Sequence, residues 1–583
     1  MQKRTYIFSL IFLSLCGIVV AQETDDIGTE TVTVVKPYSP TVSDAFKIKS
    51  APNLNDSIVL QKKKIDYSIF SVPVASTFTP AKGKASGVER TPPPTLYNSY
   101  ASVGLGNYNN ALVDLYTSRE FNRGEDLLDF GLTHQSSRGD LDSTPLETDF
   151  YNTKLNASYA KKDRYMDWGA SIGLQHQLYN WYGIQNDAFD ETTVAAMDEQ
   201  QNYFNAEAKA HLNMEDSFFK TGNILLRRFW DATESGENRV VIKPTLELPI
   251  TEELVTIGVK VDFVNGNFKN ASLNNTANDG EINYSQLQAG VTPSLLILRD
   301  DLTVNLGASF VYGLDTENSD GNFYIYPAVT ASYRVLDENV IAYGGIEGEL
   351  KQNSYHDFVM DNPYVSPTLS VMPTDQQYEG YVGLKGQLTS NIGYNIKGSY
   401  TAENGKPLFF LNPQNLLRDD EKSYYYGNSF QVFYDDVKTL GIFGELNVDV
   451  NRNFSLGVNA EFYDYDTETD NPAWNLPTIK GSLFMDYQIN EQWYFGANLF
   501  YVGERDDLVS QATVGAEPFE FPSAIVTLDS FFDANAHAGY HINEQLSVFV
   551  KASNIANSDY QRWANFRVQG FQALAGVSYK FDF

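Results

Sequence analysis

Hydrophobic and polar residues alternate along most of the chain from residue 97 to residue 583, which is the pattern of strands rather than helices. Clear examples are residues 255–263, 302–312 and 440–450, where apolar side chains occupy every second position. Such segments approach the roughly 9 to 11 residues that a tilted strand needs to cross a bilayer. The pattern predicts an all-β protein whose strands are long enough to span a membrane.

The connections between the predicted strands alternate in length. Short turns are expected at residues 161–164, 214–217, 251–253, 299–301, 337–339, 389–391, 451–453, 490–492 and 543–545. Longer polar connections lie between them, at residues 180–200, 265–281, 352–375, 401–424 and 504–525. Outer-membrane barrels are built in this way, with short turns on the periplasmic side and long loops outside. We therefore predict a transmembrane antiparallel outer-membrane β-barrel of about 22 strands, with residues 424–450 forming either one strand or two.

Two smaller patterns repeat with the predicted hairpins. Residues 487–492 (YQINEQ) recur as residues 540–545 (YHINEQ), each covering a strand end, a tight turn and the next strand start. Proline precedes several turns, at Pro244, Pro293, Pro327 and Pro477. Because proline breaks a bond of the strand ladder, we expect these prolines at the outer ends of descending strands.

The first 21 residues have the features of a secretory signal peptide. Lys3 and Arg4 precede an apolar run over residues 6–20, and Ala21 ends a small-residue cleavage pattern. A membrane anchor would need roughly 18 to 20 apolar residues, and this run is shorter. The only cysteine, Cys16, lies in the segment to be removed, so we expect a mature protein without thiol, disulfide or lipid anchor.

Composition fits a barrel and excludes some partners. The chain has 37 Tyr, 37 Phe and a net charge of −32. Abundant aromatic residues suit the girdles at membrane interfaces, and the acidity argues against nucleic acid as a partner. Outer-membrane lipid is the expected surrounding of the barrel.

Residues 22–96 differ in character from the barrel that follows at residues 97–583. They contain scattered prolines, a lysine run at residues 62–64 and three prolines at residues 92–94. We predict an extended N-terminal periplasmic segment, with a small folded plug as the competing interpretation.

The last strand carries a pattern that barrels present during their assembly. Val577, Tyr579, Phe581 and Phe583 occupy alternate positions, and the chain ends on the last of them. This ending is similar to the recognition strand read by the barrel-assembly machinery, which we expect as a partner during biogenesis.

Residues 546–560 (LSVFVKASNIANSDY), followed by Arg562, Trp563 and Gly570, resemble the closing strand of TonB-dependent receptors. Near the mature N-terminus, Glu30, Thr31, Val32, Thr33 and Val34 resemble the TonB box, which pairs edge to edge with the TonB protein. The resemblance covers the barrel and implies TonB as a partner. One departure stands out: the family carries a plug domain longer than the stretch of residues 35–94 that is available here. A short plug, an inward-folded loop or a partner protein would then have to close the wide lumen, unless the strand count is too high.

No motif indicates an enzyme, a cofactor or a metal site. Residues 169–173 match Gly-x-Ser-x-Gly but lie inside an alternating strand, whereas a nucleophile elbow joins a strand to a helix. The histidines are scattered, and the acidic residues 315–321 lack the order of an EF-hand. Several aromatic residues in the long loops fit interfacial anchors better than ligand contacts: Trp181, Tyr182, Phe409, Phe410, Tyr424, Tyr425 and Tyr426.

Two functions fit these observations best, with a passive porin or a lipid transporter as a further alternative. The first is a receptor that takes up a scarce nutrient, a metal chelate or an oligosaccharide, with energy delivered through TonB. The second is a barrel derived from such a receptor that serves as a scaffold or accessory subunit, with other outer-membrane subunits as partners. A missing plug favours the second, because TonB would have no gate to pull.

Overall fold

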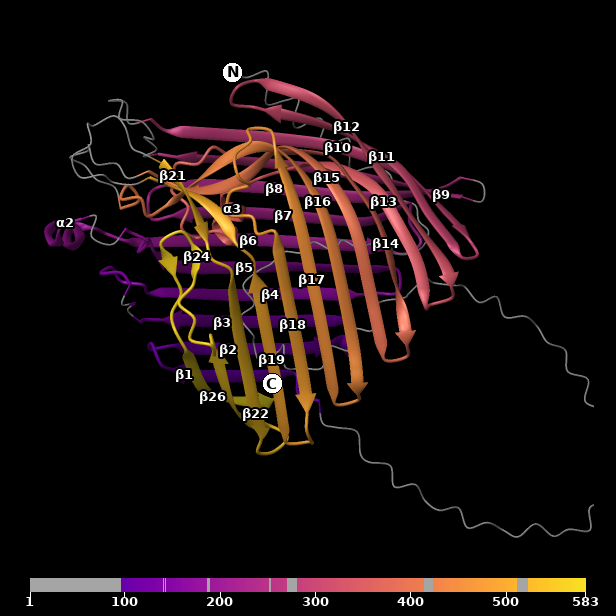
Figure 1. Ribbon diagram of the computed structural model, residues 1–583. Helices are drawn as coiled ribbons and strands as arrows, with labels where there is room; N and C mark the ends of the chain where they lie inside the picture. The colour runs from indigo at the N-terminus through magenta and orange to yellow at the C-terminus, as the bar shows by residue number, and fades with distance from the viewer. Residues whose placement is uncertain are drawn as a thin grey trace, which may run out of the picture.

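The computed structural model describes residues 96–582, except residues 140, 142, 186–188, 251–252, 270–279, 414–422 and 511–522. Twenty-two antiparallel strands pair in chain order, and the first strand also pairs with the last, so the sheet closes into a barrel (Figure 1). The predicted barrel and its strand count are confirmed. Closure satisfies the backbone hydrogen bonds of every strand without leaving an edge, as a membrane-spanning sheet requires.

The barrel strands have the following bounds: β1 (Ser99–Gly106), β2 (Ala111–Phe121), β3 (Asp126–Ser137), β4 (Phe150–Lys162), β5 (Met166–Asn180), β6 (Gln200–Met214), β7 (Phe219–Asp231), β8 (Gly236–Ile250), β9 (Glu253–Phe268), β10 (Ile282–Arg299), β11 (Leu302–Asp315), β12 (Asp320–Leu336), β13 (Val340–Lys351), β14 (Thr374–Thr389), β15 (Ile392–Leu411), β16 (Phe430–Asn451), β17 (Phe454–Thr467), β18 (Ile479–Gln488), β19 (Trp493–Val502), β22 (Phe531–His541), β23 (Leu546–Ser553) and β26 (Gln572–Phe581). Residues 430–451 therefore form one long strand.

The remaining elements lie in the connections. They are the 3-10 helix η2 (Asn122–Gly124), the helices α2 (Glu191–Ala196) and α3 (Tyr355–Asp361), and the hairpins β20 (Arg505–Ser510) with β21 (Ser523–Leu528) and β24 (Gln561–Trp563) with β25 (Phe566–Arg567). None of the helices in the described part of the chain is long and apolar enough to cross a membrane.

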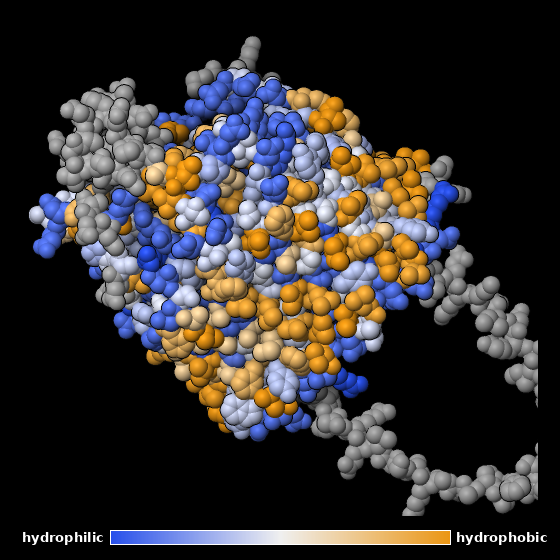
Figure 2. Space-filling model, viewed as in Figure 1, coloured by the Kyte–Doolittle hydropathy of each residue, from blue (hydrophilic) through white to orange (hydrophobic). Residues whose placement is uncertain are grey.

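The alternation in the sequence becomes an alternation of faces. On β5, Ile172 and Leu174 are 60% and 49% exposed on the outside, while the alternate residues Ser171 and Gly173 face the interior. Apolar side chains gather in the same way over the outer surface of the strands in the lower part of Figure 2. An apolar outer band around a closed sheet is the signature of an outer-membrane barrel, and the predicted location in the outer membrane is confirmed.

The short turns in the described part of the chain lie where the sequence predicted them, on the side where the last strand ends (Figure 1). The two copies of the repeated segment form the same turn: the Asn490 side chain accepts hydrogen bonds from the backbone N–H groups of Gln492 and Trp493, and Asn543 does the same for Gln545 and Leu546. The repeat is therefore a turn motif, with the asparagine holding two N–H groups that the tight turn leaves without partners.

The prediction for the prolines is wrong at three of the four positions. Pro244, Pro293 and Pro327 lie inside β8, β10 and β12, and only Pro477 precedes its strand, β18. The β8–β9 pairing skips Pro244, and the β10–β11 pairing skips Pro293. A long barrel strand tolerates such a local gap because the ladder continues on both sides of it.

Candidate functional site

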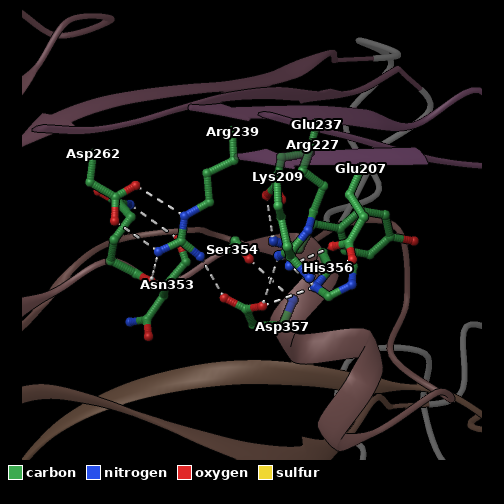
Figure 3. Close-up of polar contacts among 12 residues, drawn as sticks. Glu207, Lys209, Arg227, Glu237, Arg239, Asp262, Asn353, Ser354, His356 and Asp357 are labelled. Carbon is green, nitrogen blue, oxygen red and sulfur yellow. Dashed lines mark hydrogen bonds and ion pairs between the residues drawn. The ribbon is translucent and has the colours of Figure 1, made fainter. Parts of the chain in front are cut away.

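The connection between β13 and β14, residues 352–373, folds into the barrel instead of extending away from it. Its helix α3 begins at the N-cap Ser354, whose side chain accepts a hydrogen bond from the backbone N–H of Asp357. Tyr355, Phe358 and Val359 on this helix are buried. Figures 1 and 3 show α3 within the barrel, next to the inner faces of strands from the opposite wall. We call residues 352–373 the inward loop.

A hydrophobic core joins the inward loop to both walls of the barrel. Tyr355 packs against Phe229 of β7 with ring centroids 5.2 Å apart, and Phe358 packs against Phe409 of β15 at 5.9 Å. The Tyr203 hydroxyl of β6 donates a hydrogen bond of 2.8 Å to the carbonyl of Pro363. The loop therefore bridges the barrel interior from β6 and β7 to β15.

Two other extracellular connections complete this core. Tyr364 of the inward loop stacks on Phe566 of β25 with centroids 3.9 Å apart, and Val509 of β20 and Leu528 of β21 belong to the same cluster. Arg505 fastens the two hairpins together, because its Nη2 donates a 2.8 Å hydrogen bond to the carbonyl of Gln561. Loops distant in sequence thus form one packed layer within the extracellular end of the barrel.

An ionic network holds α3 to the wall formed by β6–β9 (Figure 3). Arg239 of β8 forms a fork with Asp262 of β9 at 3.0 and 2.9 Å, and its Nη1 reaches Asp357 at 2.8 Å. Arg227 of β7 lies 3.4 Å from Asp357 and 3.5 Å from Glu207. One carboxylate of the inward loop is therefore shared by two arginines of the opposite wall, and we call these contacts the latch.

His356 extends the latch. Its Nδ1 lies 3.0 Å from Nη1 of Arg227 and 2.9 Å from Oδ1 of Asp357. Burial lowers the pKa of His356, and the nearby Arg227 charge lowers it further against the opposing effect of Asp357. Burial alone would raise the pKa of Asp357, but the His356 contact and the two arginines outweigh it and hold that pKa below its usual range. At neutral pH the latch therefore contains a neutral imidazole and a charged carboxylate.

Glu237 of β8 provides a second anchor. Its side chain is 1% exposed, and Oε2 accepts hydrogen bonds of 2.7 Å from the Tyr284 hydroxyl and 2.6 Å from the backbone N–H of Tyr355. Gly266 makes room for the Tyr284 ring, because a Cβ at that position would lie 2.2 Å from the hydroxyl oxygen. The Tyr355 hydroxyl in turn donates to Asp231 at 2.8 Å.

Sequence reasoning missed the residues of the latch. Arg227, Arg239 and Asp262 occupy inward positions of their strands, and that pattern reveals only that they face the lumen. Asp357 lies 118 residues from Arg239, so nothing local links the two. The available signal was a serine followed by a short amphipathic stretch at residues 354–361, in a connection otherwise expected to be irregular.

The residues singled out in the sequence are not brought together. Val577, Tyr579 and Phe581 lie on the outer face of β26, where the first two are 47% and 45% exposed. Glu30, Thr31, Val32, Thr33 and Val34 lie outside the described residues, as does Phe583. The assembly signal and the TonB box stay predictions.

The loop aromatics are not interfacial anchors, which corrects the expectation from the sequence. Trp181 and Tyr424 are 1% and 2% exposed and pack edge to face at 5.5 Å, and Tyr182 packs on Phe566 in the core described above. They are buried because the loops fold onto one another instead of lying at the membrane surface. Residues 169–173 lie within β5, as expected for a strand, and the described residues contain no group of three ligands that could hold a metal ion.

Comparison with known proteins gives structural matches only. No family model matches the chain, and no curated protein sequence does. The FrpB iron transporter of Neisseria meningitidis superimposes with a TM-score of 0.62 at 11% identity, covering 84% of this chain and 83% of that one. The pyoverdine receptor FpvA of Pseudomonas aeruginosa gives 0.59 at 13% identity, covering 84% and 80%. The barrel has the fold of TonB-dependent receptors.

A third receptor-type barrel supports the same assignment of fold. The siderophore receptor PirA of Acinetobacter baumannii matches with a TM-score of 0.60 at 12% identity, covering 83% of this chain and 80% of that one. At such low identity the likeness concerns the path of the chain. The resemblance predicted from the sequence is confirmed at this level.

Proposed function

We propose that this receptor-type barrel takes up a scarce nutrient across the outer membrane and that the inward loop is its extracellular gate. The observation that carries the proposal is the loop itself, which bridges the interior from β7 to β15 and is held by the latch. A solute entering from outside has to displace this loop. The barrels that share the fold are described as a pyoverdine receptor, a siderophore receptor and an iron transporter, which favours a metal chelate over an oligosaccharide as the nutrient.

Gating by this loop has a definite energetic requirement. Moving an equilibrium from mostly closed to mostly open takes differential binding of about 5.5 kcal/mol, or an equal input of work. Residues 30–34 would deliver that work, because an extended β-prone segment pairs with TonB through backbone hydrogen bonds. Energised uptake would then depend on a segment that is predicted to be periplasmic, on the opposite side of the membrane from the gate.

Deletion of residues 30–34 tests this function. We expect the deletion to abolish accumulation of the nutrient by whole cells that depend on this protein, while leaving the amount of folded barrel in the outer membrane unchanged. A deletion of residues 50–54 in the same segment serves as the matched control and should leave uptake intact. Uptake that survives the first deletion would refute TonB coupling.

A scaffold or accessory role is the second candidate, and one observation favours it. The inward loop and the β20–β21 and β24–β25 hairpins share one buried apolar cluster, as expected of a permanent closure. Purification in mild detergent with mass spectrometry of co-purifying proteins separates the two. A stoichiometric complex with other outer-membrane subunits favours the scaffold, whereas a lone barrel, recovered with at most crosslinked TonB, favours uptake.

A further inference from the structure

The outer face of β7–β10 changes from apolar to polar between two successive rows of outward-facing residues. The last apolar row consists of direct cross-strand neighbours, namely Leu226, Val240, Phe263 and Leu287. The next row toward the long loops is polar throughout: Arg228, Asn238, Asn265 and Ser285. In a membrane-spanning barrel such a change marks the depth at which hydrocarbon gives way to lipid headgroups.

Arg228 is the charged member of the polar row, and the described part of the chain offers it no ion-pair partner. Its guanidinium reaches across to β8, where Nη1 donates a 3.3 Å hydrogen bond to Oδ1 of Asn238. A Cβ at residue 236 would lie 2.6 Å from Nη2, so Gly236 leaves the space that the guanidinium fills. Among the described residues, no carboxylate oxygen lies within 4.0 Å of the Arg228 guanidinium, which is the limit for an ion pair. In contrast, Lys269 at the same rim lies 3.4 Å from Glu234.

A row of aromatic rings lies one outward position beyond Arg228, toward the long loops. Trp230 stacks on Phe204 with centroids 5.4 Å apart, Phe204 stacks on His176 at 4.4 Å, and His176 meets Tyr151 edge-on at 4.9 Å. All four side chains face outward, from β7, β6, β5 and β4. Aromatic rings of this kind settle at the boundary between hydrocarbon and headgroups, which places Arg228 at this boundary.

Exposed amides lie on the other side of Arg228. Asn265 of β9 and Asn283 of β10 are exposed on the outer face, two residue rows from the apolar band at most. Amide groups both donate and accept hydrogen bonds, which suits the hydroxyl and acyl-amide groups of a sugar headgroup. A guanidinium fork matches the oxygens of a phosphate in two parallel hydrogen bonds.

We propose that the outer rim of β7–β10 binds the phosphorylated sugar headgroup of an outer-leaflet glycolipid, with Arg228 on the phosphate. The charge has no ion-pair partner among the described residues and therefore favours an external anion, the depth selects a membrane lipid as its source, and the flanking amides favour a sugar. The site lies on the opposite face of the wall from the latch and is independent of any transport function.

The test compares lipid retention by the purified full-length protein and its variants. The protein would be incorporated into phosphatidylcholine nanodiscs containing a minor fraction of lipid A, and bound lipid A would be counted by native mass spectrometry. We expect Arg228→Ala to weaken retention about tenfold, the loss of a charge-assisted fork, and Arg228→Lys to give an intermediate value. Lys269→Ala, which removes a cation paired with Glu234, should retain lipid A like the wild type.

A second variant leaves the arginine in place. Gly236→Ala puts a methyl group where the guanidinium lies, so it should displace Arg228 and reduce retention while the barrel keeps its heat-modifiable folded form. Equal retention of lipid A by wild type and Arg228→Ala overturns the proposal. The proposal is also overturned if the wild-type protein retains dephosphorylated lipid A as well as it retains lipid A. Displacement of lipid A by millimolar inorganic phosphate would overturn it too, because it would indicate a site for the free ion.

Discussion

Arg227 and Arg228 are neighbours on β7, yet they face opposite sides of the barrel wall and are neutralised in different ways. Arg227 faces the interior, where Glu207 and Asp357 lie 3.5 and 3.4 Å away. Arg228 faces outward above the last apolar row and meets no carboxylate of the described chain within 4.0 Å. The first charge is balanced by the fold, whereas the second depends on its surroundings.

The two arginines therefore stabilise different things, although strand alternation makes them neighbours in sequence. Inside, the arginines connect a loop to a wall more than a hundred residues away in sequence, so their loss should loosen a tertiary contact. Outside, the described hydrogen bond of Arg228 is to its own sheet, so the loss of this arginine should leave the loops unchanged. Substitutions on the two faces can therefore be used as controls for each other.

The largest effect is expected when an inward arginine is removed. Arg239→Ala leaves Asp262, whose side chain is 2% exposed, without its ion pair, and breaking a buried pair in this way costs about 3–5 kcal/mol. The same change removes the 2.8 Å contact to Asp357. We expect hydrogen exchange of residues 352–373 to accelerate by at least tenfold, as measured by mass spectrometry.

The matched control for this change is Arg228→Ala, because an exposed substitution away from tertiary contacts usually alters stability by less than about 0.5 kcal/mol. Exchange of residues 352–373 should stay at the wild-type rate in this variant. Equal protection of the inward loop in both variants would show that the latch contributes nothing to holding it.

The alternation that separates these two arginines also explains how much of the fold was predictable. A strand period of two, together with short and long connections in turn, fixes a closed barrel and its strand count, because each hairpin depends on local sequence alone. The turn asparagines Asn490 and Asn543 are similarly local. The prediction that these prolines lie at strand ends failed because Pro244 and Pro293 are tolerated in mid-strand, where long neighbouring ladders compensate for the missing bonds.

The site was not predictable for a different physical reason. Whether Trp181 lies at the membrane interface or under other loops depends on which loops meet, and Trp181 meets Tyr424 from far along the chain. Asp357 and Arg239 are likewise joined only by the inward fold of residues 352–373. Sequence periodicity identifies the face of a strand, but not the loop that will cover it.

A smaller effect should appear on acidification, and it sharpens the comparison of the two faces. Burial holds the pKa of His356 below its usual 6.5, so the folded protein disfavours the imidazolium. The pKa of Asp357 lies below its usual 3.8, so its stabilising contribution is complete above pH 3.8 and is lost as the pH falls further. Both shifts act in the same direction: docking of the inward loop should weaken below about pH 6.5, and again below about pH 3.8.

A fluorophore on the loop would detect this change. Cys16 is the only cysteine of the chain and lies in the predicted signal peptide, so Ser370→Cys provides a single labelling position on an exposed residue. We expect the label to become more mobile as the pH falls through 6.5. His356→Gln, which keeps a hydrogen-bond acceptor for Arg227 but does not titrate, should abolish that step and preserve the step below pH 3.8. A titration unchanged by this substitution would assign the pH response to another group.

The smallest effect concerns the neighbouring hairpin and has the opposite sign. Asp507 of β20 is 0% exposed, and burial raises its pKa to about 6, although its Oδ1 accepts hydrogen bonds from the backbone N–H groups of Leu411 and Leu508. A folded-state pKa above the usual 3.8 means that ionisation opposes folding. The penalty is complete above about pH 6 and is relieved as the pH falls toward 3.8.

Asp507→Asn keeps an acceptor oxygen for both N–H groups without the charge, so it should raise the thermal midpoint at pH 8 by a few degrees and leave it nearly unchanged at pH 4. A stabilisation equal at both pH values would mean that packing around the amide, and not removal of a buried charge, is responsible, and the hairpin would then lack the pH response that distinguishes it from the latch.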